Sequence, residues 1–163
     1  TLAGRGKDNW RTAIVLEELL DALGALPELN VEVIVRPHPK MSASDFDRFK
    51  GEIIVAAGGD PLEAVSRANA VIGMTSMLLI EAAIVGRPVL SILPRAIEKS
   101  WLGPIKSGMI CCVTTEIELK TALPKLLSGN IPRELQREWV SELAQGSLAQ
   151  HICKLGSEPS EKI

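Results

Sequence analysis

Aromatic residues are scarce in this sequence: it contains no tyrosine, and phenylalanine and tryptophan together make up 3% of it. Proteins that bind single-stranded nucleic acid without sequence preference stack successive bases on aromatic side chains. Basic residues are no more frequent than acidic ones, with 18 Lys and Arg against 20 Asp and Glu, so no strong positive field attracts polyanions. We therefore expect no nucleic-acid partner and no direct attraction to an anionic membrane.

Histidine and cysteine are also few. His38 and His151 are too isolated to build a metal site from protein ligands alone. The three cysteines, Cys111, Cys112 and Cys153, are odd in number, and adjacent cysteines neither match a zinc-ligand spacing nor pair readily with each other. We expect reduced structural thiols and no metal.

Long apolar segments are lacking too. The longest apolar stretch, residues 77–85, contains Glu81 and is far shorter than the roughly 20 residues that a helix needs to cross a bilayer. Residues 1–7 do not show the charged and then apolar layout of a secretory signal. These features predict a cytoplasmic protein without a transmembrane segment.

What is present is enough for one hydrophobic core. A chain of 163 residues, 46% of them hydrophobic, buries about two-thirds of its unfolded surface as a single domain. We expect that domain to cover residues 1–150 and a tail to cover residues 151–163. Because residues 1–3 are typical of the end of a strand, we expect the first strand to be truncated and the natural protein to extend further toward its N-terminus.

Short apolar, β-branched runs alternate with amphipathic stretches, as in chains that build a parallel sheet from βα units. Several runs are apolar at consecutive positions, which is typical of strands covered by helices on both faces. The sequence therefore predicts an α/β domain of three layers with a mostly parallel sheet. The expected strands are residues 31–35, 52–56, 70–73, 88–92 and 109–113; the expected helices are residues 10–23, 61–68, 75–85, 116–127 and 133–148.

The turn after residues 70–73 carries the sharpest functional signal. Thr75 and Ser76 stand where the next helix is expected to begin. Free N–H groups at a helix start, together with the helix dipole, favour a negative charge. The sequence therefore predicts a phosphate at Thr75 and Ser76.

Glu81 is the charged residue in this helix, which we expect to be buried on most sides. A buried carboxylate needs donors, and the hydroxyls of a sugar are suitable. At about 1.5 Å per residue, Ser76 and Glu81 are roughly 7.5 Å apart along the axis, comparable to the span from diphosphate to ribose. A structural pairing of Glu81 with an arginine, or a cap on a nearby loop, fits the same spacing.

Two loops add candidate residues. Arg36 and His38 follow the strand expected at residues 31–35, and two prolines restrict their backbone, so this pair is suited to bind phosphate or to move a proton. A solvated arginine and a histidine that caps a helix end are the structural alternative. The turn from Gly4 to Gly6 lacks the spacing of a phosphate-binding loop and is a weak signal.

Four segments together resemble the C-terminal half of GT-B fold glycosyltransferases: Arg36-Pro37-His38-Pro39, residues 70–76, Glu81-Ala82 and residues 86–90. The resemblance is closest to bacterial surface-polysaccharide enzymes and their relatives, including the UDP-N-acetylglucosamine 2-epimerases. It covers roughly residues 1–128. It implies a Rossmann-like domain that holds the nucleotide of an activated sugar.

The resemblance also implies roles for the candidate residues. Thr75 and Ser76 would hold the phosphates and Glu81 the ribose hydroxyls of a UDP- or CDP-sugar, with no further cofactor and no metal. His38 would be the catalytic residue at the cleft, with Arg36 supporting it. The turn from Gly4 to Gly6 would line the same cleft.

Two departures limit what the resemblance implies. GT-B enzymes have two such domains, and this chain has room for one, so an N-terminal acceptor-binding domain or a partner subunit is expected to complete it. Such a partner would hold the chain peripherally at the inner membrane. Met77-Leu78 replaces a glycine pair of the epimerases, which favours glycosyl transfer. An epimerase-like or hydrolytic enzyme completed by oligomerisation, and a stand-alone nucleotide-binding module, are the alternatives.

Overall fold

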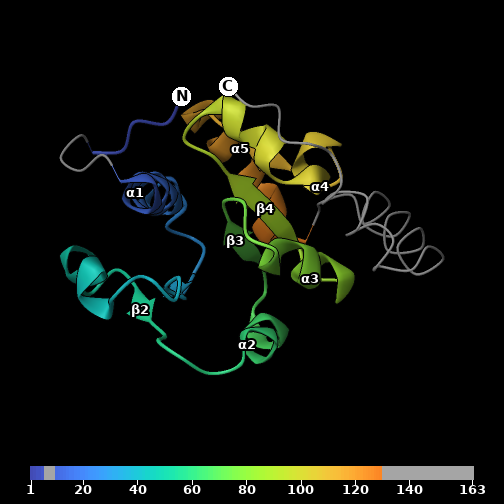
Figure 1. The fold of residues 1–163 in the computed structure, drawn as a ribbon. Helices are drawn as coiled ribbons and strands as arrows, with labels where there is room; N and C mark the ends of the chain where they lie inside the picture. Colours follow the sequence, from blue (N-terminus) through green and yellow to red (C-terminus); the bar gives the residue numbers. More distant parts are fainter. Residues whose placement is uncertain (6–9, 130–163) are drawn as a thin grey trace.

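The computed structural model describes residues 1–5 and 10–129, which form an α/β protein with short parallel sheets flanked by helices (Figure 1). The helix expected at residues 133–148, the tail at residues 151–163, and Gly6, His151 and Cys153 lie outside the described residues. The helices are α1 (Arg11–Gly24), α2 (Pro61–Arg67), α3 (Leu78–Ile84), α4 (Gly103–Lys106) and α5 (Glu116–Leu127), with two 3-10 helices, η1 (Ala43–Phe49) and η2 (Ala96–Trp101).

All five expected strands are present, and each is shorter than the apolar run that predicted it. They are β1 (Ile34–Val35), β2 (Ile54–Val55), β3 (Val71–Gly73), β4 (Val89–Ile92) and β5 (Cys112–Val113). Every pairing between them is parallel, as predicted. The strands form two sheets, however, with β1 beside β2 in one and the order β3-β4-β5 in the other. Residues 1–3 are not a strand; Leu2 is buried, and its N–H donates to the carbonyl of Pro94 at 3.3 Å.

Strand β4 is covered on both faces, which confirms the layered arrangement around it. Val89 packs in one core cluster with residues of α2, α3 and α4. Leu90 and Ile92 point to the opposite face, where they pack with residues of α1 and α5. Because successive side chains of a strand alternate between its faces, this split places helices on either side of the three-stranded sheet.

The expectation of two covered faces is wrong for the pair β1 and β2. Val33 and Val35 pack on Ala13 and the other buried residues of the cluster that α1 shares with η1. The register partners Ile34 and Ile54 lie on the other face and remain 58% and 49% exposed. Their β-branched side chains favour an extended backbone whether or not a helix covers them, so the apolar run predicted the strand but not its surroundings.

Polar capping groups explain where two helices begin. The Asp60 side chain accepts the N–H of Leu62 at 3.0 Å, and Pro61 occupies the first position of α2. At α5 the Thr115 hydroxyl accepts the N–H of Glu118, whose carboxylate in turn accepts the N–H of Thr115. This reciprocal capping box satisfies amide groups that the helix itself cannot bond.

Candidate functional site

The turn between β3 and α3 carries Thr75 and Ser76. Its start is fixed by Ser91 of β4, whose hydroxyl donates to the carbonyl of Met74 at 2.7 Å. Helix α3 begins at Leu78, later than predicted, and the Ser76 hydroxyl accepts the Leu78 N–H at 3.2 Å. With seven residues, α3 is too short to develop a strong dipole, so a ligand here would be held by the hydroxyls and amides of the turn.

Glu81 is exposed, so the expectation that it lies in a buried setting is wrong. Helix α3 buries Leu79, Ile80, Ala82 and Ala83, and the remaining side of this short helix turns Glu81 toward solvent. Its carboxylate makes no hydrogen bond or ion pair with another residue of the part of the chain that the structure describes. The alternative of a structural arginine partner therefore has no support among those residues, and the carboxylate is open to a ligand.

Arg36 joins two loops that follow the carboxyl ends of β1 and β2. Its two terminal nitrogens donate to successive carbonyls, those of Gly58 at 2.7 Å and Gly59 at 2.6 Å. Both glycines have a positive φ, +94° and +76°, which lets the loop present the two carbonyls to one planar guanidinium. Since the loop leads directly into Asp60, Arg36 positions the start of α2.

His38 lies exposed in the same loop as Arg36. Its Nδ1 accepts the N–H of Lys40 at 3.2 Å, which places the proton of the neutral imidazole on Nε2. No hydrogen bond in the described part of the chain joins Arg36 or His38 to Thr75, Ser76 or Glu81. The catalytic role of His38 therefore stays a prediction.

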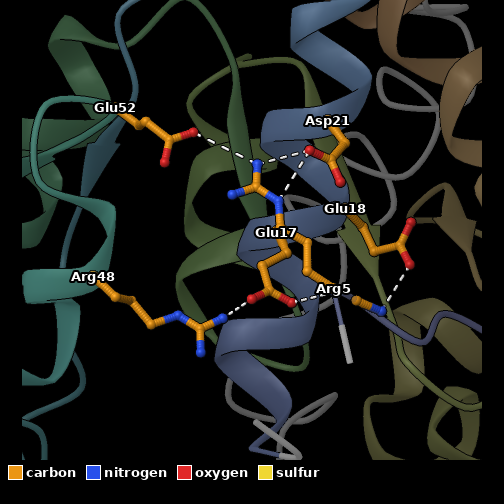
Figure 2. A network of polar contacts seen from close by, with 7 residues as sticks. Arg5, Glu17, Glu18, Asp21, Arg48 and Glu52 are labelled. Carbon is orange, nitrogen blue, oxygen red and sulfur yellow. Dashed lines mark hydrogen bonds and ion pairs between the residues drawn. The ribbon is translucent and has the colours of Figure 1, made fainter. Parts of the chain in front are cut away.

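The glycine turn at the start of the chain is bonded to α1 (Figure 2). The N–H groups of Ala3 and Gly4 donate to Glu18 Oε1 at 3.1 and 2.9 Å, and that of Arg5 donates to Glu17 Oε2 at 2.6 Å. The amides that a phosphate would use are thus occupied by carboxylates, and a ligand there would have to displace them. The place of Gly4 in a ligand cleft stays a prediction, and Gly6 lies outside the described residues.

Ion pairs extend this network across the molecule (Figure 2). The buried Glu17 also pairs with Arg48 of η1, so one carboxylate joins α1, η1 and the turn. Arg5 donates to Asp21 at 2.7 Å and lies 3.6 Å from Glu52. The hydrogen bond to Asp21 raises the pKa of the Arg5 guanidinium. Sequence reasoning missed Glu17 and Glu18, because acidic residues in the middle of a helix carry no signal of a distant turn.

Neither a family model, nor a curated protein, nor a solved structure matches this chain.

Residues 1–5 and 10–129 contain neither a cluster of metal ligands nor a membrane-spanning helix. No group of three or more His, Cys, Asp or Glu in that part of the chain is arranged to hold a metal ion. None of its helices has the length and apolar character needed to cross a membrane. Cys111 and Cys112 are free thiols, and burial raises the pKa of both, which keeps them protonated and weakly reactive.

Proposed function

We propose that this domain binds the nucleotide part of a nucleotide sugar and is the donor-binding half of a glycosyltransferase with a GT-B, Rossmann-like fold. The substrate would be a nucleoside diphosphate sugar such as a UDP- or CDP-sugar. An acceptor-binding domain or partner subunit would complete the enzyme. The resemblance of residues 36–39, 70–76, 81–82 and 86–90 to that family motivates the proposal.

The observation that carries the proposal is the place of Thr75 and Ser76 directly after a strand. They follow the carboxyl end of β3, which pairs in parallel with β4 in the three-stranded sheet β3-β4-β5. In open α/β sheets, ligands bind beyond the carboxyl ends of the strands. The turn that carries the two hydroxyls lies at such an end.

The chemistry of that turn supports the same ligand. The hydroxyls of Thr75 and Ser76 and the amides around them are donors for a diphosphate. The exposed carboxylate of Glu81, which has no protein partner among the described residues, is an acceptor for two adjacent ribose hydroxyls. Along this segment the phosphate donors come first and the ribose acceptor second. A nucleoside diphosphate presents its phosphates and its ribose in the same order.

In this proposal, the loop that Arg36 holds lines the ligand site together with the turn after β3. Because Arg36 is engaged with Gly58 and Gly59, it acts by positioning that loop. His38, with its proton on Nε2, is the group in this loop that could donate a hydrogen bond to a bound diphosphate or leaving oxygen. In the completed enzyme, His38 would have to lie next to the ligand.

Titration calorimetry with uridine diphosphate tests the proposal through Glu81→Ala. A hydrogen bond to a charged group is worth about 1.5–3 kcal/mol, so the variant should bind uridine diphosphate about tenfold more weakly or worse. Because Glu81 is exposed and unpaired, its removal should leave the melting temperature nearly unchanged.

Glu116→Ala is the matched control, since Glu116 is also an exposed glutamate in the first turn of a helix, α5. It should bind uridine diphosphate as the unchanged protein does. Equal affinity of the Glu81 variant and the Glu116 variant would contradict the assignment of ribose to Glu81. Absence of any binding of uridine diphosphate would contradict the proposed function as a whole.

A further inference from the structure

Four residues near the carboxyl end of β4 form a second polar cluster, the Arg–Trp cluster: Arg11 at the start of α1, and Arg95, Glu98 and Trp101 around η2. The Glu98 side chain is fully buried, at 0% exposed, and accepts hydrogen bonds from both arginines, including one of 2.7 Å from Arg95 Nε. The Arg11 guanidinium lies 4.8 Å from the centre of the Trp101 ring and that of Arg95 lies 6.0 Å from it.

Glu98 is charged in this setting. Burial raises the pKa of its carboxyl, but the hydrogen bonds from Arg11 and Arg95 outweigh burial and hold the pKa below its ordinary value. Two guanidiniums and one carboxylate give the cluster a net charge of 2 − 1 = +1. A buried carboxylate that accepts from both arginines also fixes their orientation, which is the arrangement of a prepared anion site.

The cluster remains accessible above the buried carboxylate. The Arg95 side chain is 57% exposed, Trp101 is 53% exposed, and the Arg11 side chain is 36% exposed. Arg95 engages Glu98 through Nε, which leaves its terminal amino groups as donors. The Nε atom of Arg11 is buried and has no hydrogen-bond partner.

We propose that the Arg–Trp cluster binds a sugar that carries a single carboxylate. The guanidinium fork matches a carboxylate in shape and charge. The exposed part of the Trp101 ring offers a flat apolar surface for the C–H groups of a sugar ring. The net charge of +1 is balanced by one carboxylate, whereas a phosphate monoester brings about −1.5 to −2.

This inference goes beyond nucleotide binding, which the β3–α3 turn serves in the proposed function. It specifies that the sugar is acidic, such as a uronic acid, and that this sugar is part of the donor or the acceptor. The test below uses no nucleotide, so its outcome is separate from that of the uridine diphosphate titration.

The experiment follows the indole N–H signals of the three tryptophans by NMR, with Trp101→Phe to assign the signal of Trp101. Three probes carry different groups at the sixth carbon of a glucose ring: methyl glucuronide with a carboxylate, methyl glucoside with a hydroxyl, and methyl glucoside 6-phosphate with a phosphate. The glucuronide should shift the Trp101 signal saturably, the glucoside should leave it in place, and the phosphate should bind more weakly than the glucuronide.

Three substitutions separate binding from folding. Arg95→Ala should weaken glucuronide binding about tenfold or more, whereas Arg67→Ala, which removes a 78% exposed arginine paired with Glu63 on α2, should not. Glu98→Gln raises the cluster charge to +2 and should shift its preference from the glucuronide toward methyl glucoside 6-phosphate. If this variant fails to fold, the comparison of Arg95→Ala with Arg67→Ala still tests whether the cluster binds the glucuronide.

Three results would overturn the inference. One is an unmoved Trp101 signal at saturating glucuronide in the protein as it stands. Another is an equal response to the glucoside, which would mean that the carboxylate is not recognised. The third is an Arg95→Ala variant that binds the glucuronide as well as Arg67→Ala does.

Discussion

Gly4 is the residue of the N-terminal turn whose replacement the structure restricts most. Its φ is +64°, a conformation that costs an L-residue about 1–2 kcal/mol. A Cβ at this position would also overlap the Glu17 carboxylate that accepts the Arg5 N–H. The backbone conformation and the contact with Glu17 together therefore favour glycine here.

Gly4→Ala should lower the free energy of unfolding by more than the backbone cost alone, to be measured by urea denaturation. Gly108→Ala is the matched control, because Gly108 has a φ of +80° with no heavy atom within 4 Å of an added Cβ. The control should lose about 1–2 kcal/mol and the Gly4 variant more. Equal losses would show that the contact with Glu17 contributes nothing to stability.

Single residues also mark the limit of sequence reasoning. The hydroxyls of Thr75 and Ser76 were placed correctly after β3, because a strand followed by small polar residues predicts such a turn. Glu81 was expected to be buried, since an apolar run does not reveal which side of a short helix meets solvent. The carbonyl partners of Arg36 come from a loop more than twenty residues away, and no local pattern predicts them.

At the scale of elements, helix α5 shows what the sequence can predict. Its observed bounds, Glu116–Leu127, are those expected, and the structure adds the Thr115 cap that fixes its start. The 3-10 helices η1 and η2 and the one-turn helix α4 were not predicted, since segments of four to seven residues give no periodicity to read. The division into two sheets was also missed, because strand pairing depends on distant segments.

The capping box of α5 predicts an effect of pH. The N–H of Thr114, followed by the other donors of the box, lowers the pKa of Glu118 below its ordinary value of 4.5. A carboxylate whose pKa is lower in the folded state stabilises the fold at neutral pH, and this contribution is lost as pH falls through its folded-state pKa.

Glu118→Ala should therefore lower the melting temperature at pH 7, and the difference from the unchanged protein should shrink as pH falls from about 5 toward 3. Thr115→Ala, which removes the other half of the box, should cost about 0.5–2 kcal/mol at pH 7. Melting curves recorded by circular dichroism give both values. A difference for Glu118→Ala that stays constant down to pH 3 would contradict the role of the ionised carboxylate.

At the scale of the whole molecule, α1 relates the two sheets to each other. Ala13 and Leu16 pack with the strands β1 and β2, whereas Val15 and Leu19 pack with residues of β4 and β5. The two halves of the candidate site follow β1 and β3, which belong to different sheets. Their relative position therefore depends on the packing of this one helix and on the network around Glu17.

Affinity for uridine diphosphate compared with uridine, measured by titration calorimetry on the unchanged protein, tests the central claim most directly. If the turn at Thr75 and Ser76 holds a diphosphate, the nucleotide should bind about tenfold or more tightly than the nucleoside, because the turn donates to charged oxygens that uridine lacks. Equal affinity for the two, or no affinity for either, would contradict the account.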